Sequence, residues 1–75
     1  MELDPQLREQ LIERAREVAG ERGWTWREPI EVSRSAEGGE AVWLVRSNVM
    51  SRGQNAVIVF RQSDLGLVRA GYLPR

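Results

Sequence analysis

The sequence predicts an α+β fold in which one N-terminal helix packs on a four-stranded antiparallel sheet, in the order α-β-β-β-β. Three observations predict it. Apolar residues recur at helical spacing between residues 5 and 19, two runs rich in β-branched and aromatic residues flank Met50 to Gly53, and a further strand-like segment lies on each side of that pair. A chain of 75 residues is expected to form one domain, 1–75, with a small core.

The helix is expected to span about residues 4–22. Asp4 can accept hydrogen bonds from the free N–H groups of the first turn, and Pro5 suits the first helical position because it has no N–H. Gly23 is well placed to end the helix in a left-handed conformation. The apolar stripe that should face the sheet consists of Leu7, Leu11, Ile12, Ala15, Val18 and Ala19.

The connection from the helix to the first strand carries Trp24 and Trp26. Two rings in a short connector could stack on bases or sugars, but rings at a helix-to-strand corner more often close the end of a small core. We favour the core role. Pro29 biases Glu28 toward an extended backbone, so a strand should begin there.

The strands are expected at about residues 30–35, 41–49, 55–61 and 67–73. Ser35 to Glu40 reads as a turn whose paired glycines permit positive φ angles, and Ser63 to Gly66 reads as a second turn.

The two middle strands, 41–49 and 55–61, should form a hairpin, and the length of its loop decides which of their side chains share a face. With an even-length loop, odd residues of the second strand share a face with even residues of the third. The bulkier face should then cover the helix stripe and holds Trp43, Val45, Ala56, Ile58 and Phe60. A three-residue loop ending at Gly66 in a left-handed conformation would add Val68, Ala70 and Tyr72 to that face.

The opposite face has no helix to cover it. Its apolar centre is expected to be Val42, Leu44, Val57 and Val59, with a rim of Arg46, Arg61 and Arg69. An apolar centre inside an arginine-rich rim is the composition of a protein interface. The alternative is a thin sheet with scattered exposed valines, which is common. We favour the interface because the valines are contiguous.

The expected partner is a second copy of the chain or another protein. A two-fold pairing through Val42, Leu44, Val57 and Val59 would supply the second cover that a short chain cannot build for itself. Acidic residues on the helices could meet the arginine rim. The sequence therefore predicts a small protein–protein interaction module.

Catalysis is not expected, because the chain has no His, Cys or Lys. Their absence removes the usual acid–base pairs, covalent nucleophile pairs and zinc sites. Asp64, the only acidic residue after residue 40, lies where turn formation is the ordinary role of Asp. No catalytic residue, cofactor or metal is predicted.

Nucleic acid or another polyanion is the alternative partner. Net charge is zero, but residues 1–40 hold ten acidic and six basic side chains, whereas residues 41–75 hold one acidic and five basic ones. All eleven basic residues are arginine, and strands that present arginine beside aromatic rings can hold a nucleic-acid backbone and its bases. The pI of about 6.3 and the acidic helix make this partner the less favoured one.

A cytoplasmic location without membrane contact is expected. No apolar run approaches the roughly 20 residues that span a bilayer, and the first ten residues are charged and polar where a signal peptide would need an apolar core.

The strand Trp43-Leu44-Val45 and the segment VIVFRQSDLGLVRAGYL resemble PepSY-type domains and small cystatin-like immunity proteins. Gly66 and its flanking strands match the PepSY pattern, whereas Arg61 stands in place of the expected Asp and Leu65 in place of the Thr. The resemblance implies an interaction or inhibitory module rather than an enzyme. PepSY modules are usually extracytoplasmic, which disagrees with the expected location.

Overall fold

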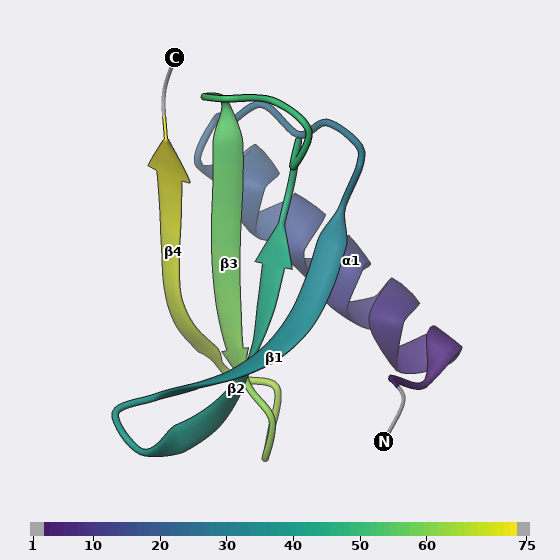
Figure 1. The fold of residues 1–75 in the computed structure, drawn as a ribbon, viewed down its shortest axis with the longest axis vertical. Helices are drawn as coiled ribbons and strands as arrows, with labels where there is room; N and C mark the ends of the chain where they lie inside the picture. Colours follow the sequence, from purple (N-terminus) through teal and green to yellow (C-terminus); the bar gives the residue numbers. More distant parts are fainter. Residues whose placement is uncertain (1–2, 74–75) are drawn as a thin grey trace.

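The computed structural model describes residues 3–73, and its order of elements is the predicted one. One helix lies behind a four-stranded antiparallel sheet whose strands are neighbours in sequence order (Figure 1). This arrangement confirms the α+β class. The elements are α1 (Pro5–Glu21), β1 (Glu31–Glu37), β2 (Glu40–Arg46), β3 (Asn55–Arg61) and β4 (Leu67–Leu73).

Both ends of α1 are formed as the sequence predicts. The Asp4 carboxylate accepts from the backbone N–H of Gln6 at 3.2 Å, and Pro5 is the first helical residue. Gly23 has a φ of 72° just beyond the C-cap residue Arg22, so the chain leaves the helix through a left-handed glycine.

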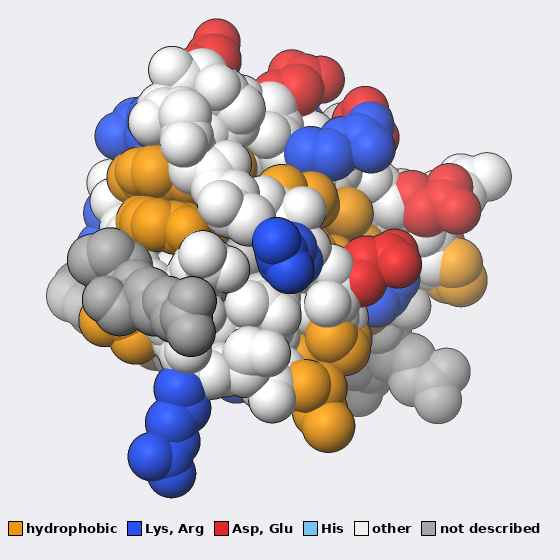
Figure 2. Space-filling model, turned by 90° about the horizontal axis from the view of Figure 1, so that it is seen from above, with side chains coloured by type: hydrophobic (Ala, Val, Ile, Leu, Met, Phe, Trp, Pro, Cys, Tyr) orange, Lys and Arg blue, Asp and Glu red, His pale blue; other side chains and the backbone are white. Residues whose placement is uncertain are grey.

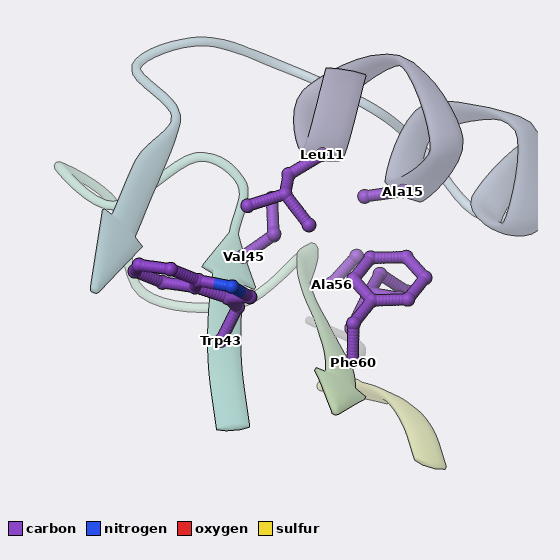
Figure 3. Close-up of a cluster of buried hydrophobic side chains, with 7 residues drawn as sticks. Leu11, Ala15, Trp43, Val45, Ala56 and Phe60 are labelled. Carbon is purple, nitrogen blue, oxygen red and sulfur yellow. The ribbon is translucent and has the colours of Figure 1, made fainter. Parts of the chain in front are cut away.

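The core lies between α1 and one face of the sheet. Leu11 and Ala15 point from the helix toward β2 and β3 (Figure 3). Cross-strand neighbours in an antiparallel pair share a face, and the register pairs residue 43 with residue 60 and residue 45 with residue 58. The predicted helix-side face is therefore confirmed. Its members in the buried cluster are Trp43, Val45, Ala56, Ile58 and Phe60.

Trp24 and Trp26, the two tryptophans of the connection between α1 and β1, belong to this core. Both are partly buried against the cluster, and the ring of Trp24 stacks on that of Tyr72 with centroids 5.5 Å apart. Each ring thus has an intramolecular packing partner, in agreement with the core role that we favoured over ligand stacking.

The β1–β2 hairpin is longer at its tip than predicted. Glu37 pairs directly with Glu40, so the turn consists of Gly38 and Gly39 alone, with φ angles of 60° and 80°. Two successive positive φ angles define the tight turn that suits the twist of a hairpin. The strands expected at 30–35 and 41–49 are in fact 31–37 and 40–46.

This long hairpin crosses in front of the lower part of the sheet, on the side away from α1 (Figure 1). Glu37 at its tip reaches Arg69 on β4, although β2 and β3 lie between the two strands. Arg69 donates to both carboxylate oxygens of Glu37, from Nε at 2.9 Å and from Nη2 at 2.6 Å. The sheet is therefore curled until its two edge strands are joined by a side-chain bridge.

The turn before β4 differs from the prediction. The left-handed residue is Leu65, with a φ of 58°, and Gly66 lies close to the guanidinium of Arg61, which would have to move to make room for a Cβ there. A register shift between Val59 and Phe60 then pairs Phe60 with Leu67. This bulge gives Leu67 the place opposite Phe60 that we expected for Val68. Both side chains stay partly exposed, Leu67 at 39% and Val68 at 37%.

Candidate functional site

The face of the sheet away from α1 was predicted to be uncovered, but the structure divides it into two halves. Val42 and Val59 are completely buried within the monomer, so the prediction that they are exposed is wrong. Leu44 and Val57 are only half-buried, and Arg46 is exposed. We call the region of Val42 and Val59 the closed half, and that of Leu44, Arg46 and Val57 the open half.

The β1–β2 hairpin is the physical reason for the closed half, because it lies over this part of the sheet (Figure 1). The bridge between Glu37 and Arg69 holds its tip in place. Gln62 adds a second attachment, since its side chain donates to the carbonyl oxygen of Val42 at 3.0 Å and its backbone N–H donates to that of Ala41. The hairpin of the same chain thus covers Val42 and Val59, a role that we had expected a second copy to fill.

The three rim arginines are present on this face, but each has a carboxylate partner in its own chain. Arg46 pairs with Glu31 across β1 and β2. Arg61 donates to Asp64 at 3.1 Å, and Arg69 binds Glu37. The rim therefore consists of ion pairs within the chain. This corrects the expectation that its arginines would bind acidic residues of a second copy.

Two of these carboxylates have altered pKa values. The hydrogen bonds from Arg69, with the charge of that residue, lower the pKa of Glu37 below its ordinary 4.5. For Asp64 the backbone N–H of Gly66 is the largest cause and the hydrogen bond from Arg61 the next, and they lower its pKa below 3.8. Both carboxylates stay charged well into the acid range, so these bridges persist at neutral pH.

The open half contains a hollow of about 510 Å³. Val57 lies in it between Arg46 on β2 and Gly71 on β4, and Gly71 has no side chain to cover the valine. Met50 and Leu73 border the hollow and are 82% and 61% exposed. The full lining is Glu31, Arg46, Ser47, Val49, Met50, Ser51, Asn55, Val57 and Leu73.

The loop between β2 and β3, residues 47–54, forms one wall of this hollow and is held by buried polar groups. The side-chain amide of Asn55 donates to the carbonyl oxygens of Ser47, Asn48 and Ser51, at 3.2, 2.7 and 3.2 Å. The hydroxyl of Ser47, completely buried, accepts from the backbone N–H of Ala56 at 2.9 Å. The loop that carries Met50 is therefore held in place by hydrogen bonds within the chain, without a partner.

Sequence reasoning missed this wall. It extended the second strand to residue 49. Asn48 has a φ of 55° and donates its backbone N–H to the carbonyl oxygen of Arg27, which ends β2 at Arg46. The available signal was an Asn on each side of a glycine-containing loop, since Asn tolerates this conformation and bonds to nearby backbone.

Two other hollows are less suited to a protein partner. One of about 530 Å³ lies beside α1, where Arg8 already donates to the carbonyl oxygen of Ile30. One of about 210 Å³ lies on the other side of the 47–54 loop and is lined mainly by polar groups, including Arg27 and Arg52. Of these three hollows, as the described residues 3–73 line them, that of the open half alone has large exposed apolar side chains on its border.

Figure 2 looks onto the end of the molecule that is uppermost in Figure 1: acidic side chains gather along one edge of this view, and hydrophobic side chains reach the surface at several separate places. Among residues 3–73, no group of three or more acidic side chains is placed to hold a metal ion. Within that same range, no helix is both long and apolar enough to cross a bilayer.

Comparison of the chain with protein families, with curated proteins and with solved structures gives no match. The resemblance to PepSY-type and cystatin-like domains therefore stays a prediction, and the function has to be argued from the surface itself.

Proposed function

We propose that the protein is a small non-enzymatic interaction module that binds a partner protein through the open half of its sheet. The observation that carries the proposal is the hollow over Val57, bordered by the exposed side chains of Met50 and Leu73. An apolar side chain of a partner that enters this hollow would remove all three from water, and this burial is the main driving force of protein association.

The surroundings of the hollow fit a protein partner better than a polyanion. Among the described residues that line it, Arg46 is the only cation, and it is already paired with Glu31. This lining is therefore a neutral polar border around an apolar centre. Such a border with such a centre is the usual anatomy of a protein interface. The arginines of the predicted rim have their charge balanced by Glu31, Asp64 and Glu37, so they offer a polyanion little net positive charge.

Selection of peptides from a random library displayed on phage tests the proposal without a known partner. We expect enriched peptides to share an apolar or aromatic anchor, and their binding to shift the amide NMR signals of Val57, Met50 and Leu73. Val57→Arg should abolish this binding while the protein stays folded.

Val68→Arg is the matched control, because it makes the same change at a part-exposed valine outside the hollow. It should leave peptide binding intact. Enrichment of no peptide, or peptides that bind the Val57→Arg protein as well as the wild type, would contradict the proposal.

A further inference from the structure

The two edge strands of the sheet differ in how they are protected. β1 carries Glu31, Arg34 and Glu37 among its seven residues, and charges along an edge discourage pairing with another strand. β4 has the sequence LVRAGYL, so Arg69 is its only charge, and that charge is neutralised by Glu37. Figure 1 shows β4 at the free side of the sheet, with no helix or strand beside its upper part and the tip of the β1–β2 hairpin near its lower end.

The hydrogen-bond pattern shows which backbone groups β4 leaves free. Along an antiparallel strand, residues that bond to one neighbouring strand alternate with those that bond to the other. Ser47 N–H donates to the carbonyl oxygen of Ala56, and Arg61 N–H to that of Gly66. On β3, even residues therefore bond to β2 and odd residues to β4.

The pairing of β3 with β4 shows which residues of β4 bond to β3 and which direct their backbone groups outward. Val57 pairs with Gly71, and Val59 with Arg69, so Gly71 and Arg69 direct their backbone groups toward β3. Ala70, between them, and Tyr72 then direct their N–H and C=O groups away from the sheet. Each offers one donor and one acceptor to a further strand.

We infer that a second copy of the chain binds this edge, through an antiparallel pairing of β4 with β4 about a two-fold axis at Gly71. In that register Ala70 of one protomer lies opposite Tyr72 of its partner, and the reverse, so the four free donor and acceptor groups of each protomer are all used, in four hydrogen bonds between the strands. Gly71 lies opposite its own copy in a non-hydrogen-bonded pair, where the backbones approach to about 4.5 Å between Cα atoms.

The side chains are compatible with this register. Small Ala70 meets large Tyr72 on the helix side, and the aliphatic part of Arg69 meets Leu73, 61% exposed in the monomer, on the other side. No like charges face each other. The pairing also stays within the regular part of β4, because the bulge opposite Val59 lies before Arg69 and Pro74, which has no N–H to donate, follows Leu73.

This inference goes beyond the proposed function, because it concerns the edge of the sheet and a second copy rather than the hollow and its peptide. The two open halves would lie on the same side of a continuous eight-stranded sheet, with Val57 of each protomer next to the axis residue Gly71.

The absence of cysteine from the chain allows a direct test by Gly71→Cys. A Cβ at Gly71 meets no atom within 4 Å in the monomer, so the variant should fold. Across the axis the two thiols would lie at the Cα separation of a disulfide, within the usual range of about 4.4 to 6.8 Å. Leu73→Cys is the matched control, since the two copies of residue 73 would be about 13 Å apart.

We expect mild oxidation to convert Gly71→Cys into a covalent dimer at protein concentrations where Leu73→Cys remains monomeric, and urea to remove this difference. Wild-type sedimentation should shift from monomer to dimer as concentration rises. A wild type that stays monomeric at high concentration together with equal crosslinking of the two variants would overturn the inference. Faster crosslinking of Leu73→Cys would overturn the register. Peptide binding to Val57 is measured separately, so either proposal can fail alone.

Discussion

Glu37 and Arg69, 32 residues apart, join the two edge strands of a sheet in which those strands are not neighbours. Their two hydrogen bonds close the curl of the β1–β2 hairpin over Val42 and Val59. This ion pair fixes the tip of the hairpin beside β4, next to the half of the face opposite α1 that is buried.

The bridge predicts a dependence of stability on pH. The folded pKa of Glu37 lies below its ordinary 4.5 because Arg69 stabilises the charged form. Its contribution to the free energy of unfolding is therefore complete above about pH 4.5 and is lost as pH falls through the folded pKa. Urea unfolding should show Glu37→Gln less stable than wild type at neutral pH, with a difference that shrinks in acid.

Glu40→Gln is the control for this measurement, because Glu40 is exposed on the other side of the same two-residue turn. It should unfold like the wild type at neutral pH. A Glu37→Gln protein as stable as wild type at neutral pH would show that the bridge does not hold the hairpin.

The wall of the hollow should depend on Asn55. Asn55→Ala removes one donor group from three loop carbonyl oxygens, and we expect a loss of about 1 to 3 kcal/mol in the free energy of unfolding. Peptide binding at the hollow should weaken as well, since Met50 would lose its fixed position. Arg52→Ala, on the exposed part of the same loop, should change stability by no more than about 0.5 kcal/mol.

Binding to nucleic acid should be weak and should disappear as salt is added. Arg46, Arg61 and Arg69 have their charge balanced by carboxylates of the same chain, so the sheet offers phosphates little net positive charge. Fluorescence anisotropy of a labelled oligonucleotide over a salt series measures this. Tight binding that persists at physiological salt would instead support the polyanion alternative.

The helix-side core could be predicted because it depends on local rules. The stripe of α1 follows from helical spacing, and the partners of Trp43 and Val45 follow from strand alternation and an even-length loop of eight residues. None of these steps needs knowledge of residues far apart in the chain.

The closed half could not be predicted in the same way. Whether Val59 is buried depends on how far the hairpin curls, which is a property of the whole sheet, and on a contact between Glu37 and Arg69 that no periodic pattern marks. The bulge at Val59 and Phe60, which pairs Leu67 with Phe60, likewise follows from no periodic pattern in the sequence.

The most direct test of the central claim, that half of this face is closed and half is open to a partner, is thermal unfolding of Val57→Arg and Val59→Arg. Val59 is completely buried and Val57 is not, so Val59→Arg places an unpaired charge inside the protein. We predict that Val59→Arg fails to fold, as Ile58→Arg on the helix side should, while Val57→Arg unfolds cooperatively near the wild-type temperature. A folded Val59→Arg protein beside an unfolded Val57→Arg protein would contradict the division of the face.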